Sequence, residues 1–217
     1  MNPLEVAVVT GGHNYDVRGF QRLFEAMDGV HAFVQHMDEF ACASHEVRDA
    51  YDVVVFFTML KEGPSDEGHP WYAGQPAAAV SHLGAAPQGI VLLHHGILAY
   101  PDSPVWQALT GPIGRSRGPT NNQRIRVQVA DPAHPVTRGL ADWEMTDEVY
   151  LMDEPGPDSH VLLSVDHPKS MKHLAWTRTY QRSRVFCCQS GHGPAAWEDV
   201  NFREVLRRGI FWSAGRS

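Results

Sequence analysis

The chain has 217 residues, of which 43% are hydrophobic and 20% are charged, and its formal net charge is -7. This length and composition are typical of one globular domain with a core large enough to fold without disulfides. The acidic balance excludes the broad basic surface that binds nucleic acid, and no apolar run approaches the roughly 20 residues that span a membrane. Three cysteines, Cys42, Cys187 and Cys188, make no disulfide framework, so we expect reduced thiols and a cytoplasmic protein.

The first half of the chain predicts strands and helices in alternation. Leu4–Thr10 is apolar and rich in β-branched residues, which favours a strand covered on both faces, and Gly11 ends it, so this run is not a signal peptide. Apolar residues recur at helical spacing over residues 17–27, which predicts a helix. The elements expected next, in chain order, are a strand at 31–36, a helix beginning at Ser44, a strand at 51–57, a helix at 75–83, a strand at 89–93 and a short helix at 106–109.

From about residue 124 the pattern changes to short strands separated by turn residues. Two loops rich in Gly and Pro precede this change, at 61–74 and 111–123, and the first is a candidate lid over the sheet edge. Together with the β-α alternation, the pattern predicts an α/β fold with a doubly wound, mostly parallel sheet and helices on both faces. Residues 1–217 are expected to form one domain. The later elements are partly antiparallel strands at 124–129, 161–164, 174–177 and 184–188 and a final amphipathic helix at 202–212.

Three of the predicted strands run into loops that combine glycine with histidine. The first strand leads to His13, the strand that ends at residue 93 leads to His94 and His95, and the last strand leads to His192. The carboxyl ends of parallel strands meet at one edge of a sheet, and α/β sheets bind their ligands there. The sequence therefore predicts a site at this edge, although each histidine could instead fill a turn or the core.

The predicted site combines imidazoles with carboxylates. His94 and His95 stand where hydrolases of this topology carry a Ser or Cys nucleophile, and histidine there can be a general acid, a general base or a metal ligand. Asp147 and Glu148 can supply an orienting carboxylate or a base. In extended backbone their side chains point to opposite faces, so at most one is expected in the site, and a solvated turn is the competing interpretation. The candidate catalytic residues are His13, His94, His95, Asp147, Glu148 and His192.

Residues near this edge are also candidates for substrate contacts. Glycine lets the backbone approach a ligand, and aromatic faces stack on sugar rings, although aromatic residues also build cores. The candidates are Gly12, Asn14, Gly96, Tyr150, Trp176 and Trp197. None of the 13 histidines falls into a short metal-binding motif, so we expect no metal and no other cofactor. Three distant histidines with Asp147 or Glu148 are still able to form a zinc site in space.

Six short motifs are spread over nearly the whole chain. They are VVTGGH at 8–13, LLHHGI at 92–97, PVTRGL at 135–140, TDEVY at 146–150, AWTR at 175–178 and GHGPAAW at 191–197. In this order they resemble the ThuA-like (trehalose utilisation) family. The resemblance implies the fold of class I glutamine amidotransferases, a flavodoxin-like sheet with helices on both faces. Amidotransferases carry a cysteine where this chain has His94-His95, and family members frequently have His-Gly there, so we do not expect a Cys-dependent glutaminase.

The resemblance also implies carbohydrate metabolism. Family members act beside sugar dehydrogenases on trehalose and related disaccharides through 3-keto sugars, so the expected partners are a small-molecule sugar and a sugar dehydrogenase of the same pathway, with a homodimer as the assembly. Our first hypothesis is acid/base chemistry on a disaccharide or 3-keto sugar by a cofactor-independent lyase, hydrolase or isomerase. His192 or His95 then acts as base or acid, and His13 holds the oxyanion. The alternatives are a non-catalytic sugar-binding or scaffold domain and a metal-dependent hydrolase.

Overall fold

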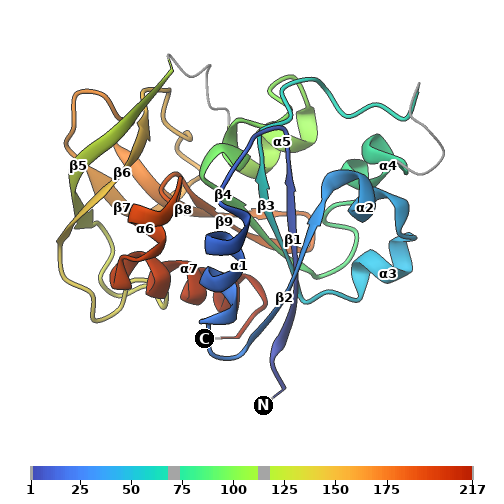
Figure 1. The fold of residues 1–217 in the computed structure, drawn as a ribbon, viewed down its shortest axis with the longest axis horizontal. Helices are drawn as coiled ribbons and strands as arrows, with labels where there is room; N and C mark the ends of the chain where they lie inside the picture. Colours follow the sequence, from blue (N-terminus) through green and yellow to red (C-terminus); the bar gives the residue numbers. More distant parts are fainter. Residues whose placement is uncertain (1, 68–73, 112–117, 217) are drawn as a thin grey trace.

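The computed structural model describes residues 2–67, 74–111 and 118–216, and a nine-stranded sheet crosses it in the order β2-β1-β3-β4-β9-β8-β7-β5-β6 (Figure 1). The five strands from β2 to β9 in this order run parallel to one another, which confirms the predicted α/β class. Four of them have the apolar sequences of strands buried on both faces, whereas β2 lies at the edge of the sheet and is only partly buried. The five strands are β1 (Leu4–Gly11), β2 (Val30–His36), β3 (Val53–Thr58), β4 (Gly89–Leu93) and β9 (Ser183–Cys188).

The other four strands extend the sheet from β9 in antiparallel pairs. They are β5 (Pro119–Val129), β6 (Trp143–Tyr150), β7 (His160–Val165) and β8 (His173–Tyr180). Strand β5 begins at Pro119, within a segment predicted to be a loop, and its pairing with β6 shifts register between Thr120 and Gln123. Strand β6 was not among the predicted strands, because its adjacent acidic residues interrupt the apolar alternation that marks a strand.

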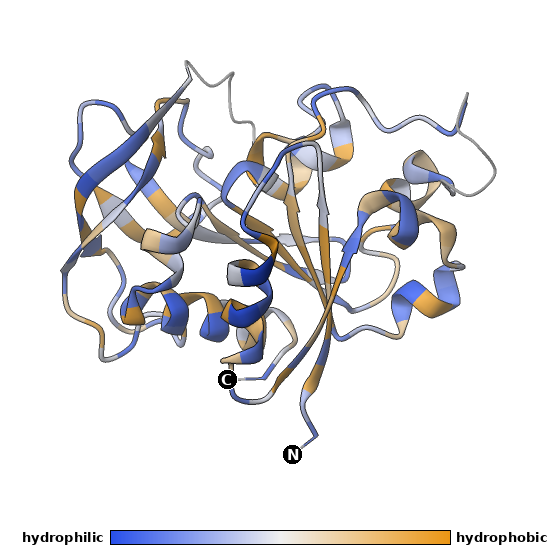
Figure 2. Cartoon of the chain, in the orientation of Figure 1, coloured by the Kyte–Doolittle hydropathy of each residue, from blue (hydrophilic) through white to orange (hydrophobic). Residues whose placement is uncertain are grey.

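Helices cover both faces of the parallel strands (Figure 1). One face packs against α1 (Val17–Glu25), α6 (Pro194–Trp197) and α7 (Val200–Ser213), and the other against α2 (Met37–Cys42), α4 (Pro76–Ser81) and α5 (Pro104–Thr110). Successive strand residues alternate between the two cores. Cys188 therefore belongs to the first core and Cys187 to the second, as predicted. Figure 2 shows the apolar residues concentrated along the central strands.

Several elements differ from the sequence-based expectation at their ends. Helix α1 stops at Glu25, and α5 begins at Pro104 because Ser103 caps it. Four helical segments are each six residues long or shorter: α2, α6, the 3-10 helix η2 (His94–Leu98) and α3 (His45–Asp49). Of these, α3 matches the helix that was predicted to begin at Ser44. Turns this short carry little periodicity, which is why three of them were missed.

Both predicted loops are only partly described. Residues 68–73 of the candidate lid and residues 112–117 of the second loop lie outside the described residues. In the part of the chain that the structure describes, no helix is both long enough and apolar enough to cross a membrane. The longest, α7, has 14 residues.

Candidate active site

The carboxyl ends of β1, β4 and β9 lie at one edge of the sheet, because these strands are parallel and close together in the strand order. His13 follows β1, His94 and His95 open η2 directly after β4, and His192 follows β9. The ring centroids of His13 and His95 are 3.5 Å apart, and those of His94 and His192 are 5.0 Å apart. The structure thus brings together the four histidines that the sequence places at this edge, and β6 adds Glu148 from the antiparallel half.

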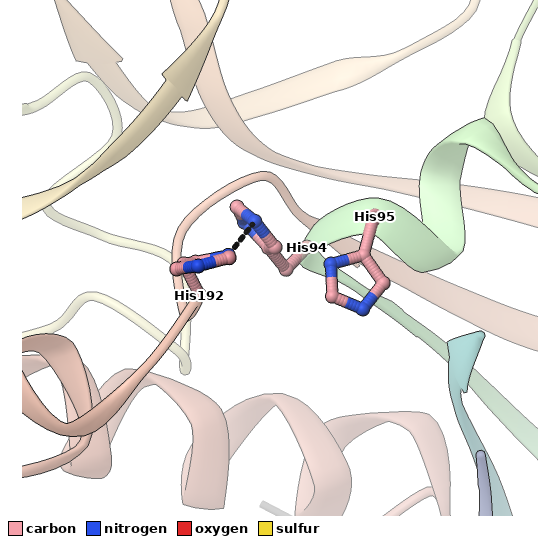
Figure 3. Close-up of side chains that lie close together, drawn as sticks. All are labelled: His94, His95 and His192. Atoms are coloured by element: carbon pink, nitrogen blue, oxygen red, sulfur yellow. Dashed lines mark hydrogen bonds between the residues drawn. The ribbon is translucent and has the colours of Figure 1, made fainter. Parts of the chain in front are cut away.

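The turn from β4 into η2 places His94 at the centre of the cluster. His94 has a φ of +51°, a conformation that residues other than glycine adopt at a cost, and its side chain is 0% exposed. Its Nδ1 donates to the Gln189 carbonyl at 2.6 Å, so in the neutral imidazole Nε2 presents a lone pair. That Nε2 lies 3.2 Å from Nδ1 of His192 (Figure 3). The strand-turn-helix shape is that of a nucleophile elbow, with an imidazole in place of the nucleophile.

Glu148 is the acidic residue that faces the histidines. Its Oε1 lies 3.3 Å from Nε2 of His94 and 3.4 Å from Nδ1 of His192, and its side chain is 5% exposed. Burial alone raises the pKa of this carboxyl, but a hydrogen bond from Tyr150 and the neighbouring imidazoles of His94 and His192 outweigh burial and hold the pKa below its ordinary value. Glu148 is therefore an ionised carboxylate beside two imidazoles.

Asp147 holds the His192 loop in place. Its Oδ2 accepts from the backbone N–H of Gly191 at 2.7 Å, and its Oδ1 accepts from the N–H of His192 at 3.1 Å and of Glu148 at 2.9 Å. Gly191 has a φ of +116°, and a Cβ there would lie 2.8 Å from the Phe202 ring. Through these bonds Asp147 anchors the loop that carries His192, and it lines the same cavity as Glu148, so its catalytic role stays a prediction.

The remaining two histidines are neutral and crowded. Burial lowers the pKa of His13, and burial together with the neighbouring His94 lowers the pKa of His95 strongly. Nδ1 of His13 donates to the Asn14 carbonyl at 2.9 Å. Among the described residues, no hydrogen-bond partner faces Nε2 of either ring. His192 is more accessible, with 47% of its side chain exposed, and its pKa is lowered by partial burial and by His94.

Two cavities flank the end of β6. A cavity of about 260 Å³ is lined by Glu148 and His192 together with the amide side chains of Asn121 and Asn122. A second cavity, of about 480 Å³, has Tyr150 in its wall, and its polar lining includes Lys61, Asp102 and Gln107. The ring centroid of Tyr150 is 5.2 Å from that of His94, so this tyrosine contacts both the second cavity and the histidine cluster. Both cavities can hold a polar ligand of the size of a sugar ring.

The two tryptophans proposed to stack on sugar are core residues. Trp176 is 0% exposed and Trp197 is 4% exposed. The indole N–H of Trp176 donates to the Thr110 carbonyl at 2.9 Å, and that of Trp197 donates to the Gly191 carbonyl at 2.9 Å. Their faces are covered by other side chains, so neither offers a surface for a sugar ring. Trp197 instead supports the loop that carries His192.

The proposed glycine contacts also have packing explanations. A Cβ on Gly96 would collide with the Phe56 carbonyl oxygen, so glycine there allows η2 to rest on β3. Gly12 has a φ of +80°, and a Cβ there would lie 2.6 Å from the Met59 carbonyl carbon. Asn14 is exposed, and its backbone carbonyl orients His13. Of the six proposed substrate contacts, Tyr150 is the one that lines a described cavity.

Sequence reasoning missed three residues that belong to this edge. The carbonyl of Gln189 fixes the ring of His94, and its own side-chain amide is buried without a partner among the described residues. Asn121 and Asn122 reach the His192 cavity from β5. Gln189 stands directly after a buried strand and before the Gly-His loop, which is a signal for a site residue. The two asparagines carried no signal, because they fall in a segment that was predicted to be a loop.

Residues 5–213 match the model of the ThuA family, described as trehalose utilisation. The chain belongs to the ThuA family. No curated protein matches this ThuA-family chain significantly. The match confirms the resemblance seen in the six motifs.

Solved structures show the same fold. A ThuA-like protein from Parabacteroides merdae has a TM-score of 0.74 and 18% identity, covering 99% of this chain and 91% of that chain. A ThuA-like protein from Bacteroides uniformis has a TM-score of 0.71 and 18% identity, covering 98% and 92%. PurLQS from Thermotoga maritima has a TM-score of 0.62 and 12% identity, covering 98% and 99%. The likeness confirms the fold of ThuA-like and amidotransferase-like proteins.

Proposed function

We propose that this ThuA-family protein removes a proton from the carbon beside the ketone of an oxidised sugar, such as a 3-keto disaccharide. One observation carries the proposal. The ionised Glu148 carboxylate lies within 3.4 Å of two imidazole nitrogens, in the wall of a cavity of about 260 Å³. The family description, trehalose utilisation, supports a sugar as the substrate class.

The proposed step uses the acidity of a C–H bond next to a carbonyl. Glu148 takes the proton, and the electrons of the C–H bond move to the ketone, which becomes an enolate. The histidines beside the carboxylate stabilise the negative charge on the enolate oxygen. The enolate then reforms the ketone and expels the glycosidic oxygen from the next carbon, and Glu148 returns its proton to that oxygen. The net reaction is an elimination that consumes no oxidant or reductant.

The substrate of this step has to be made by another enzyme. An unoxidised disaccharide has no ketone in its rings and therefore no comparably acidic C–H bond. A reaction that oxidises a ring hydroxyl, the class catalysed by sugar dehydrogenases, supplies the ketone. We therefore propose a sugar dehydrogenase as the upstream partner.

The test compares two carboxylates on the same strand. Glu144 of β6 is exposed and pairs with Arg124, so Glu144→Gln is the matched control for Glu148→Gln. Proton NMR of trehalose and 3-keto-trehalose follows the anomeric signals with each protein. We expect new signals from the keto sugar with wild type and Glu144→Gln, and a rate about 10²–10⁴-fold lower with Glu148→Gln. Equal rates for both variants would contradict the proposal, and saturable binding without product would favour a sugar-binding domain.

A further inference from the structure

The histidine cluster has the spacing of a metal site. His94, His95 and His192 each present one ligand atom, and these atoms lie within 4.8 Å of one another (Figure 3). Nε2 of His94 and Nδ1 of His192 are 3.2 Å apart. In a tetrahedral zinc site with bonds of about 2.0–2.1 Å, two ligand nitrogens are about 3.3–3.4 Å apart. Two of the three ligands are therefore in place, and the ring of His95 has to move by roughly 1 Å to complete the set.

The hydrogen bond behind the His94 ring is that of a metal ligand. A ligating histidine donates its other ring N–H to a carbonyl or carboxylate, which fixes the tautomer and orients the ring. His94 does this through Nδ1 to the Gln189 carbonyl at 2.6 Å. Its Nε2 is then left with a lone pair that faces the centre of the cluster.

One ring nitrogen of the cluster is buried without a hydrogen-bond partner among the described residues. His95 is 2% exposed, and its Nε2 has no hydrogen-bond partner among the described residues. A buried polar atom without a partner is costly, so such atoms in a native protein need an explanation. The ring centroids of His94 and His95 are only 4.8 Å apart, and Glu148 adds a negative charge beside them. A cation at the centre of the cluster satisfies the nitrogen lone pairs and the carboxylate together.

We propose that His94, His95 and His192 bind a divalent transition-metal ion, with Zn²⁺ as the first choice. Imidazole ligands favour Zn²⁺ over Mg²⁺ or Ca²⁺, which prefer oxygen. Three protein ligands leave a fourth position open, and the accessible His192 directs it toward the cavity of about 260 Å³. Only the catalytic role of the ion rests on the proposed function. In that role the ion polarises the ketone oxygen, and Glu148 beside it acts as the base.

Metal titration of the chelator-treated protein tests the site directly. Calorimetry with ZnCl₂ measures stoichiometry and affinity, absorption with CoCl₂ reports tetrahedral coordination, and MgCl₂ is the negative control. We expect one Zn²⁺ per chain, and His192→Ala should weaken zinc binding more than about 100-fold. We expect the same loss of zinc affinity with His94→Ala. Since His94 is fully buried, that variant can fail to fold, and the variant of the half-exposed His192 then still tests the site.

His160→Ala is the matched control. This exposed histidine also pairs with a carboxylate, Asp131 at 2.8 Å, but belongs to β7, outside the cluster. We expect this variant to bind Zn²⁺ as wild type does. No stoichiometric zinc binding, or equal zinc affinity of the His192→Ala and His160→Ala variants, would overturn the metal site.

The metal site and the proposed reaction can fail separately. Specific zinc binding without turnover of any keto sugar supports the site and removes the proposed function. Turnover by a chelated protein that binds no zinc removes the site and leaves the proposed function standing.

Discussion

Replacing Asp147 by Asn tests whether one buried carboxylate holds the His192 loop in place. The carboxylate accepts three backbone hydrogen bonds, at 2.7 Å from Gly191, 3.1 Å from His192 and 2.9 Å from Glu148. The Asn side chain keeps one acceptor oxygen, which can serve the two bonds that share Oδ1. Its NH₂ group then faces the N–H of Gly191, so that bond is lost.

The lost bond is charge-assisted and its donor is buried. Such a bond contributes about 1.5–3 kcal/mol, and a buried N–H left without an acceptor adds to the cost. Removing a buried charge recovers part of this sum. We expect Asp147→Asn to lower the free energy of unfolding by about 2–3 kcal/mol, measured by urea denaturation. Because the loop carries His192, we also expect weaker zinc binding.

The same substitution at Asp142 provides the control. Asp142 accepts one backbone hydrogen bond, from Val129 at 3.0 Å, in an exposed setting. Asp142→Asn should cost less than about 1 kcal/mol. If the two variants unfold at the same urea concentration with the same slope, the loop does not depend on Asp147 and the reasoning fails.

Three further predictions concern the supports of the site. Gly191→Ala should destabilise the fold and weaken zinc binding, because a Cβ would collide with the Phe202 ring at 2.8 Å, and wild-type values in denaturation and calorimetry would contradict this. Trp176→Phe should lower the free energy of unfolding by about 1–2 kcal/mol in urea denaturation, because the Thr110 carbonyl loses its hydrogen-bond donor. The KM for a keto sugar should stay unchanged, and a large rise in KM would show that the ring contacts the sugar. Burial raises the pKa of both β9 thiols, that of Cys188 to about 12, so a thiol reagent should label them only after unfolding, and fast labelling of the native chain would refute their burial.

The location of the site was predictable because it depends on strand direction. Any α/β arrangement in which the strands before His13, His94 and His192 are parallel brings these residues to one edge. The apolar strands before them are among the clearest signals in the chain. The alternation rule also predicted that Cys187 and Cys188 belong to different cores.

The roles of individual side chains were less predictable because they depend on tertiary contacts. Asp147 binds the N–H of Gly191, 44 residues away in the chain, and no local pattern reports such a bond. Trp176 and Trp197 belong to motifs near the site. Packing across the sheet, however, decides whether an aromatic ring faces a cavity or the core. His94, His95 and His192 likewise come together only in the folded chain. The sequence contains no short metal-binding motif, and for that reason it predicted no metal.

The central claim is that Glu148 removes a proton beside a sugar ketone. The most direct measurement is deuterium incorporation at that carbon when 3-keto-trehalose is incubated with the zinc-loaded protein in D₂O and followed by NMR. We expect wild type and Glu144→Gln to catalyse exchange or elimination at this carbon, and Glu148→Gln to lose both activities. Either activity at the wild-type rate with Glu148→Gln, or neither above background with wild type, would contradict the role of Glu148.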